Sequence, residues 1–418
     1  MKSFLFLIAC GISFTTFTQI QQLKLASDQA SDKINGSAKR AAFIDPLAYV
    51  NPFIGTGGHG HTFPGPVAPF GMIQVGPDTR FDGWDGCGGY DSIIYGFSHT
   101  HLSGVGVPDY ADLLIVPQTG KLNTVPGYRS KKGFGSTFDH ENEKATAGYY
   151  EVKLDNGIQV KLTANNRTAM HEYTFTGCKG KRFLILDLGY RDRVIKTYAS
   201  AEGKTKVVGF RESEAWARDQ HFYFALETSV PFKKSKWIYD EKKKTYLMVL
   251  EFSSDVNQVL VKVGISGTDI EGAKNNAATE ITHWDFEAER KAAVARWRKE
   301  LAVIQASTSN QEVLTNFYTG LYHSYVHPSL WSDVDGRFRT FSNTIDRSEF
   351  PQYSVFSLWD TYRGANPLYT ILQPKRVVDF VESFRLQYKS TGLLPVWTLS
   401  NNETNCMIGY HSVSVIAD

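Results

Sequence analysis

The hydrophobic pattern of this 418-residue chain predicts strands in its middle part. Between residues 149 and 266, short apolar runs end at turn or charged residues, and no stretch of helical period separates them. The first two runs flank Asp155-Asn156-Gly157, and an Asn-Gly pair is a strong hairpin signal. So many strands without intervening helices predict a large β-sandwich. The predicted strands are 149–154, 158–164, 182–188, 221–230, 245–252 and 258–265.

Beyond Gly272 the apolar positions change to a helical period. A highly charged stretch at 283–304 predicts a long helix that connects two domains, and a second helix is predicted over 310–325. Pro374 occupies the favoured first-turn position of a third predicted helix, 375–388, which Gly392 ends. The predicted order is therefore an all-β part, a connecting helix, and then helices with aromatic-rich loops between them.

Glycine and proline dominate residues 49–117, which predicts tightly folded irregular loops with Trp84 and Tyr90 at their tips. Residues 55–60 fit the dinucleotide pattern G-x-G-x-x-G. His61-Thr-Phe-Pro-Gly-Pro follows where the helix of such a site has to begin, so a dinucleotide-binding fold is excluded.

Two histidine pairs, His59/His61 and His99/His101, have the i, i+2 spacing that can direct two side chains from a strand to one metal ion. No third ligand lies nearby in the sequence, which favours hydrogen-bonded loop histidines over a metal site.

The N-terminus predicts export. Residues 1–18 combine one early lysine with an apolar run that is too short to cross a membrane. Leu7-Ile8-Ala9-Cys10 resembles a bacterial lipoprotein box, in which Cys10 would carry lipid, and ordinary cleavage near Thr18 is the alternative. We expect a flexible spacer over 19–44 and a periplasmic or cell-surface protein, held at the outer membrane if Cys10 carries a lipid anchor.

Composition narrows the class of partner. The chain is 42% hydrophobic and 21% charged with a formal net charge of +2, which describes a soluble globular chain without the long basic face of a nucleic-acid-binding protein. Besides Cys10, the cysteines are Cys87, Cys178 and Cys406, an odd and sparse set with no Cys-x-x-Cys pair. Neither a disulfide framework nor a thiolate metal site is expected.

A carbohydrate site is predicted around Phe-Ser-Leu-Trp-Asp-Thr-Tyr-Arg, residues 356–363. Here Asp360 lies directly beside Trp359, with Arg363 three residues on. An indole face binds the apolar side of a sugar ring, and a carboxylate accepts hydrogen bonds from vicinal hydroxyls. A second dense segment, 394–411, again offers a tryptophan, a carboxylate and a histidine: Trp397, Glu403 and His411. The alternative is that both tryptophans are core aromatics.

Several segments together resemble glycoside hydrolase family 92, the calcium-dependent exo-α-mannosidases. They are residues 49–60 (Tyr-Val-Asn-Pro-Phe-Ile-Gly-Thr-Gly-Gly-His-Gly), 83–90 (Gly-Trp-Asp-Gly-Cys-Gly-Gly-Tyr), 97–104 (Phe-Ser-His-Thr-His-Leu-Ser-Gly), 357–361 and 403–411. The resemblance implies an N-terminal β-sandwich over 45–272, a helical linker over 273–306, and the first part of an (α/α)6 barrel over 307–418. It spans nearly everything after the spacer.

The resemblance also implies roles for individual residues. Trp84 would reach from the sandwich into the active site beside the leaving sugar, and Asp360 would hold hydroxyls of the released mannose. The local pattern of residues adds Trp359 and Glu403 as expected substrate-binding residues. The family's inverting mechanism uses one carboxylic acid, one carboxylate base and a calcium ion. Further pocket-lining residues are expected at Gly58, His59, Cys87, Arg363 and His411.

The family's acid, base and calcium ligands come from motifs that do not occur in this sequence, and we expect them C-terminal to Asp418. The expectation is therefore a C-terminally truncated chain, with no catalytic residue and no metal ligand of its own and with no mannosidase activity alone. If the catalytic acid lies C-terminal to Asp418, Glu403 either contacts the sugar or stabilises its own loop.

The expected function is an exported glycoside hydrolase that releases terminal α-linked mannose from glycans. One alternative is a non-catalytic carbohydrate-binding or interaction module. Another is a different (α/α)6 glycosidase or phosphorylase, because Trp-Asp motifs recur there. The Gly-Trp-Asp-Gly-Cys-Gly-Gly loop separates the first hypothesis from the last, because it belongs to the sandwich of the mannosidase family. The expected partners are mannose-containing glycans, with no nucleic acid.

Overall fold

The computed structural model describes residues 44–84, 86–107 and 109–418. The predicted export signal, the lipoprotein box at Cys10 and nearly all of the predicted spacer lie outside these residues. None of the helices in the described ranges is long and apolar enough to span a lipid bilayer.

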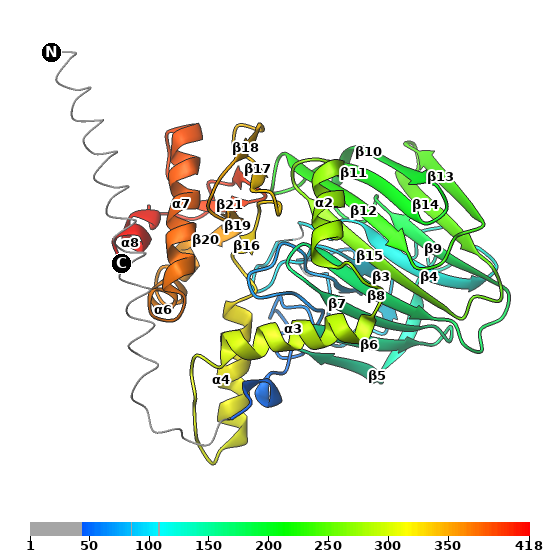
Figure 1. Cartoon of the computed structure of the whole chain (residues 1–418), viewed down its shortest axis with the longest axis horizontal. Helices are drawn as coiled ribbons and strands as arrows, with labels where there is room; N and C mark the ends of the chain where they lie inside the picture. Colours follow the sequence, from blue (N-terminus) through cyan, green and yellow to red (C-terminus); the bar gives the residue numbers. More distant parts are fainter. Residues whose placement is uncertain (1–43, 85, 108) are drawn as a thin grey trace.

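Two antiparallel sheets face one another in the N-terminal part (Figure 1). The six-stranded sheet has the order β1 (Gly76–Asp78), β3 (Gly96–Ser98), β4 (Leu114–Gly120), β9 (Lys181–Asp187), β14 (Thr245–Phe252) and β13 (Lys234–Asp240). The nine-stranded sheet has the order β10 (Arg193–Glu202), β11 (Lys206–Glu214), β12 (Gln220–Thr228), β15 (Gln258–Ser266), β8 (Thr168–Thr174), β7 (Gln159–Ala164), β6 (Tyr149–Leu154), β5 (Ser136–Thr146) and β2 (Ile93–Ile94). The predicted β-sandwich is confirmed.

All six predicted runs are strands in this sandwich. Asn156-Gly157 forms the predicted hairpin turn between β6 and β7, with Gly157 at a φ of 88° that suits glycine. Strands β8, β10, β11 and β13 were not among the predicted strands. Of these, β10 and β13 lie at sheet edges, where side chains stay exposed and no apolar run is required.

Helix α2 (Ile270–Glu280) lies against the outer face of the nine-stranded sheet, and this explains why β15 is buried on both faces. The helix approaches most closely at Gly264, where an added Cβ would lie 2.5 Å from the carbonyl oxygen of Ala273. The charged stretch predicted as a connecting helix forms α3 (Phe286–Leu301), whose Trp297 side chain is fully buried and donates a hydrogen bond to the carbonyl of Val67.

The remaining part of the chain is mainly helical and contains three small sheets (Figure 1). Asn310 caps α4 (Gln311–Ser324), and α7 (Pro374–Thr391) begins at Pro374 and ends at Gly392, as predicted. The other elements outside the sandwich are η1 (Pro46–Tyr49), β16 (Ser329–Leu330), β17 (Arg337–Arg339), β18 (Ile345–Arg347), β19 (Tyr353–Ser354), β20 (Phe356–Ser357), α5 (Leu358–Thr361), α6 (Ala365–Leu372), β21 (Trp397–Leu399), β22 (Asn402–Glu403) and α8 (Ser412–Ala417).

An aromatic side chain joins the sandwich to the helical region. Phe70 comes from a loop of the sandwich, and its N–H donates to the carbonyl of Tyr325 at 2.6 Å. Its ring lies 5.1 Å from Tyr325, 5.7 Å from Tyr369 and 5.9 Å from Phe380, measured between ring centroids. The core of the helical region is therefore completed by a residue of the N-terminal part.

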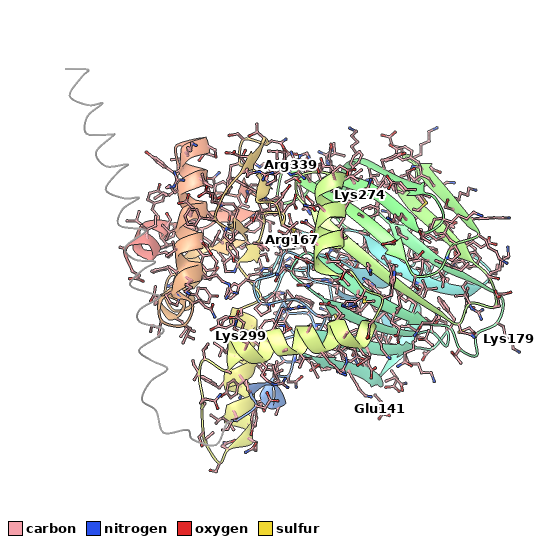
Figure 2. All side chains as sticks on the ribbon, viewed as in Figure 1. Glu141, Arg167, Lys179, Lys274, Lys299 and Arg339 are labelled. Atoms are coloured by element: carbon pink, nitrogen blue, oxygen red, sulfur yellow. The ribbon has the colours of Figure 1, made fainter. Side chains whose placement is uncertain are left out.

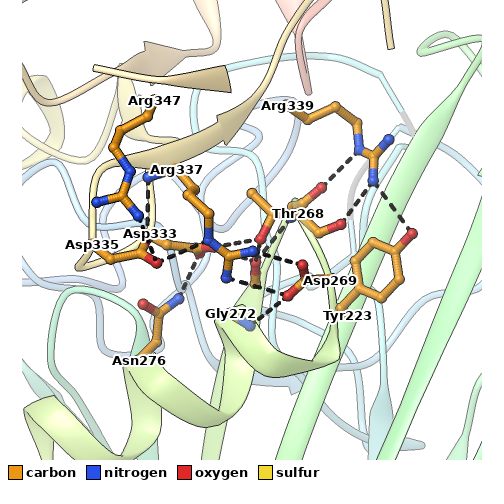
Figure 3. Close-up of polar contacts among 12 residues, drawn as sticks. Tyr223, Thr268, Asp269, Gly272, Asn276, Asp333, Asp335, Arg337, Arg339 and Arg347 are labelled. Carbon is orange, nitrogen blue, oxygen red and sulfur yellow. Dashed lines mark hydrogen bonds and ion pairs between the residues drawn. The ribbon is translucent and has the colours of Figure 1, made fainter. Parts of the chain in front are cut away.

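A polar seam joins the two parts beside α2. Figure 2 shows Arg167 and Arg339 where the sandwich meets the helical region. The buried Asp333 accepts hydrogen bonds from Ser266, Thr268 and Asn276 (Figure 3). Arg339 donates to the carbonyls of Gly267 and Thr268. These bonds hold the segment from Asp333 to Arg339 against α2 and the end of β15.

Candidate functional site

A three-stranded sheet brings the two segments predicted to bind sugar into contact. Strand β20 pairs with β21, so that Ser357 lies opposite Trp397, and β21 pairs with β22. Residues that are about forty positions apart in the sequence therefore share one sheet, and α5 follows directly after β20.

Asp360 is the exposed carboxylate of this region. It lies in the short helix α5, and one of its oxygens accepts a hydrogen bond from the Ser357 hydroxyl. A carboxylate offers about four acceptor positions. The Ser357 hydroxyl fills one of these positions, and no other described residue donates to the Asp360 carboxylate.

The aromatic residues beside Asp360 are braced by Arg363 and His411. The Arg363 guanidinium lies 4.4 Å from the centroid of the Trp359 ring and 5.0 Å from that of Tyr362, and its Nε donates to the carbonyl of Trp359. The His411 ring stacks on the Tyr362 ring, with 3.8 Å between the ring centroids and an angle of 7° between the ring planes. Arg363 thus covers one face of Trp359, which is half-buried.

Glu403 directs its carboxylate into its own loop. Oε1 accepts from the backbone N–H groups of Trp397 and Asn405 at 3.0 and 2.9 Å. Oε2 accepts from the backbone N–H of Val396 at 2.9 Å and from the side-chain amide of Gln387 at 3.2 Å. Four donors fill the acceptor capacity of one carboxylate, so this geometry favours loop bracing over sugar contact.

Asp418 marks the position beyond which the catalytic acid and base are expected. It is exposed and follows α8, and its backbone N–H donates to the carbonyl of Ser414 at 3.0 Å. This bond continues the hydrogen-bonding pattern of the helix. The described residues do not test where the acid and the base lie, so their place C-terminal to Asp418 stays a prediction.

Trp84 lies on the sandwich side and is 63% exposed. Its ring centroid is 6.1 Å from that of His61, and a Cβ added to Gly106 would lie 3.1 Å from both side chains. Arg191 donates to the carbonyl of Gly83 at 3.0 Å and so fixes the backbone just before the tryptophan. Trp84 and His61 line a narrow cleft of about 20 Å³ that also reaches Asp109.

The other predicted residues of this loop region have different environments. Cys87 is buried, and burial raises the pKa of its thiol, which makes it an inert packing group. Gly58 and His59 are exposed, and the His59 ring lies 6.1 Å from that of His61. Gly58 has a φ of 60°, a conformation that favours glycine.

An apolar cluster joins the Trp84 loops to the segment around Trp397. Leu102 and Val105 of the sandwich pack against this cluster, which also contains Trp397 and Cys406. Trp216 meets Trp397 edge to face, with ring centroids 4.6 Å apart. Trp397 is 2% exposed and is therefore a core aromatic, which was the alternative interpretation of the sequence.

Polar contacts reinforce the same junction. The backbone N–H of Asp219 donates to the Asn402 side chain at 3.0 Å, and the Asn402 amide donates back to the Asp219 carbonyl at 2.9 Å. Ser400 donates to the Tyr110 hydroxyl at 3.1 Å. The two groups of predicted residues, one around Trp84 and one around Asp360, thus belong to loops that are held against each other.

A buried charge network beneath the Trp84 cleft was not predicted from the sequence. Arg211 and Asp112 form an ion pair with fully buried side chains, and Asp112 also accepts from Gln220 and Thr100. The available signal was the pair of aspartates at 109 and 112 in an otherwise apolar stretch.

Two further aspartates of this network have raised pKa values. Burial raises the pKa of Asp192 to about 7, an effect that Arg211 partly offsets. Burial also raises the pKa of Asp109, whose carboxylate accepts from the backbone N–H groups of Trp216 and Ala217. Asp109 therefore ties the floor of the cleft to the Trp216–Trp397 contact.

The histidine pair at 99 and 101 is satisfied inside the sandwich. His99 bonds the carbonyl of Leu113 at 2.7 Å and His171 at 3.1 Å, and burial lowers its pKa to about 3. His101 bonds the carbonyl of Gln74 at 3.0 Å. Across residues 44–84, 86–107 and 109–418, no three His, Cys, Asp or Glu side chains come together as a metal site.

Both parts of the chain match models of known domains. Residues 49–266 match the glycosyl hydrolase family 92 N-terminal domain, and residues 272–418 match the glycosyl hydrolase family 92 catalytic domain. A curated relative is a secreted glycosidase of Arthroderma benhamiae, 28% identical over 359 residues, which covers 76% of this chain and 45% of the relative.

Solved structures of family GH92 mannosidases are also similar to this chain. A family GH92 alpha-mannosidase from Bacteroides thetaiotaomicron superposes with a TM-score of 0.84 at 32% identity, covering 90% of this chain and 54% of that protein. It has also been solved in complex with mannoimidazole. A family GH92 inverting mannosidase from Bacteroides thetaiotaomicron VPI-5482 gives a TM-score of 0.81 at 26% identity, covering 90% of this chain and 53% of that protein. This chain spans about half the length of these relatives.

Proposed function

Because this chain belongs to glycoside hydrolase family 92, we propose that it contributes the substrate-binding surface of an exported α-mannosidase that releases terminal mannose from glycans. Relatives at 32% and 26% identity are named as an alpha-mannosidase and an inverting mannosidase, and one of them binds mannoimidazole. The family assignment disfavours the alternative of an unrelated (α/α)6 glycosidase or phosphorylase.

The observation that carries this proposal is the junction of the Trp84 loops with the Asp360 segment. Leu102 and Val105 pack on the cluster of Trp397, whose strand pairs with the strand before Asp360. In the proposed site, terminal mannose lies where these loops meet. The Asp360 carboxylate accepts hydrogen bonds from two hydroxyls, and the exposed indole of Trp84 covers the apolar side of the sugar or its leaving group.

In this proposal the chain binds and orients the sugar, and the acid–base pair is supplied from beyond Asp418. Inversion requires two carboxyl groups about 6.5–9.5 Å apart, one protonated and one free to activate water. Glu403 has both oxygens occupied by donors, three of them backbone N–H groups and one the side-chain amide of Gln387 on α7, so it is not available as an acid or a base. Asp360 remains as a binding group whose contacts orient the sugar ring.

Calcium enters the proposal only through the resemblance to the family. The residues that the structure describes do not fit a calcium ion, because they bring no three His, Cys, Asp or Glu side chains together as a metal site. An oxygen-only shell of six to eight ligands would be needed.

A second candidate function, a non-catalytic sugar-binding or interaction module, is favoured by one observation. Of the two predicted carboxylates, Asp360 keeps free acceptor positions, whereas Glu403 does not. A module with one free carboxylate and exposed aromatic groups can bind a sugar without hydrolysing it.

Export is proposed from the apolar N-terminus and from the relative named as secreted. Attachment through lipidated Cys10 remains the alternative to ordinary signal cleavage. Replacing Cys10 by serine should release the protein from membranes if Cys10 is lipidated, whereas unchanged partitioning would exclude the lipoprotein hypothesis.

Calorimetric titration of the chain with mannose and mannoimidazole tests the proposed site. We expect Trp84→Ala and Asp360→Asn each to weaken binding about tenfold, and Tyr239→Ala, an exposed aromatic on the distant edge strand β13, to leave it unchanged. Binding that survives both substitutions would contradict the site. Hydrolysis of α-mannosides by the chain alone, abolished by Glu403→Gln at unchanged stability, would contradict the proposed division of roles.

A further inference from the structure

A groove on the outer face of the sandwich lies away from the Trp84 cleft. It has a volume of about 440 Å³, which falls within the range of small-molecule sites. One wall is helix α2, with Ala277 and Ile281, and the floor is the nine-stranded sheet, with Val208. Figure 2 shows Lys274 on this helix.

Lys262 projects from β15 at the floor of this groove. It is only 6% exposed, and its ammonium lies 4.0 Å from the centroid of the Trp284 ring. Within the described ranges it makes no hydrogen bond and no ion pair. A buried ammonium is costly without an anion, and the face of one indole is a weaker partner than a carboxylate.

The other charges of the groove are paired. Lys206 lies 3.9 Å from Glu227, and Lys274 lies 2.9 Å from Glu202. Glu227 is the cross-strand neighbour of Lys262 and raises its pKa, but burial has the larger, opposite effect. The groove therefore holds a buried ammonium beside Glu227 that forms no ion pair or hydrogen bond with any described residue, and the groove also has an apolar wall on helix α2.

This arrangement matches a particular class of ligand. An anionic group would complete the coordination of Lys262, and hydroxyls could donate to Glu202 and Glu227 at the rim. Ala277 and Ile281 would cover the apolar face of a ring. A simple inorganic anion would contact Lys262 but would not use the carboxylates or the apolar wall.

We propose that the groove between α2 and the nine-stranded sheet binds a carboxylate-bearing sugar, with the carboxylate on Lys262. The site does not depend on the proposed mannose site, since the groove and the Trp84 cleft share no lining residue. It would hold an acidic residue of a glycan, or a free uronic acid, on the face of the sandwich.

The test is an NMR titration of the chain with glucuronate, glucose and acetate, following the indole N–H of Trp284, which Trp284→Phe assigns. We expect a saturable shift with glucuronate, with affinity about tenfold higher than for glucose or acetate and lower at high salt. Equal affinity for acetate would show a plain anion site, and equal affinity for glucose a neutral-sugar site. Either result, or no saturation by about 50 mM glucuronate, would overturn the proposal.

Substitutions sharpen the same test. Lys262→Met should weaken glucuronate binding about tenfold, whereas Lys262→Arg should retain it. Lys161→Met is the matched control, because Lys161 lies on β7 of the same sheet, already pairs with Glu172 and does not line the groove. If Lys262→Met does not fold, the affinities of the unmodified chain for glucuronate, glucose and acetate still test the proposed site. A polymeric glucuronide that binds no better than free glucuronate would identify the free acid as the ligand.

Discussion

The segments around Asp360 and Glu403 resemble each other in sequence, since each sets a carboxylate near a tryptophan, but their polar atoms point in different directions. Around Asp360, the carboxylate and Arg363 are exposed and Trp359 is half-buried. Around Glu403, Trp397 is buried and the carboxylate accepts four hydrogen bonds from its own surroundings.

This difference shows how a binding carboxylate can be told from a bracing one. Both segments place a carboxylate near a tryptophan, but the number of hydrogen-bond donors around the carboxylate differs, with one at Asp360 and four at Glu403. A carboxylate whose acceptor positions are filled stabilises its loop, whereas one that is held by a single hydroxyl can still exchange that bond for a ligand. The predictions below test this distinction by stability and by activity, measured separately.

The largest expected effect concerns the buried tryptophan. Trp397→Ala should lower the free energy of unfolding by about 3–5 kcal/mol, because the side chain packs against Trp216 at the junction of the two parts. Trp359→Ala should cost clearly less, because Trp359 is half-buried. Urea unfolding of both variants gives the comparison, and equal losses would show that the two tryptophans have the same role.

Asp360→Ala should act on catalysis and not on stability. In the enzyme that carries this sequence, loss of hydroxyl contacts should lower kcat/KM about a hundredfold, or by about 3 kcal/mol. The free energy of unfolding should change by about 0.5 kcal/mol or less, since the side chain is exposed. Asp346→Ala, on exposed strand β18, is the control for both measurements. A large loss of unfolding free energy would show that Asp360 stabilises its own segment, as Glu403 does.

Much of the fold could be predicted from the sequence because its signals are local. The Asn156-Gly157 turn, the Pro374 start and the Gly392 end of α7 each depend on the backbone conformations of a few residues. The matches to both family 92 domain models confirm the predicted family, and the sandwich and the helical part occur in the predicted order.

The candidate site was less predictable because its contacts are distant in sequence. Nothing near Glu403 indicates that Gln387 will donate to it, and nothing near Trp397 indicates Trp216 as its partner. The Asp112–Arg211 pair likewise joins residues far apart in the sequence, one in the loop before β4 and one in β11. The donors to a carboxylate can be counted only in the tertiary structure. The sequence alone therefore could not tell the exposed carboxylate of Asp360 from the hydrogen-bonded carboxylate of Glu403.

Glu403→Gln should have the reverse effect of the Asp360 substitution. An amide NH2 cannot accept from the N–H groups of Val396, Trp397 or Asn405, so at least one backbone donor stays unpaired. The expected loss of unfolding free energy is about 2–3 kcal/mol. In the enzyme that carries this sequence, mannosidase activity per folded molecule should be retained. Glu349→Gln, at an exposed position, is the control. Lost activity at unchanged stability would place Glu403 in contact with the substrate.

The smallest expected effect is that of Arg363→Met, which tests whether the Asp360 segment is rigid. The guanidinium contacts the faces of Trp359 and Tyr362 and donates one hydrogen bond to the backbone, all at an exposed position. Its removal should cost about 0.5–1 kcal/mol of unfolding free energy. Arg363→Lys should recover part of this, because an ammonium also interacts with an indole face but lacks the planar fork of the guanidinium. A loss as large as that of Glu403→Gln would mean that the Asp360 segment is braced as firmly as its counterpart, and the contrast between the two segments would then rest on exposure alone.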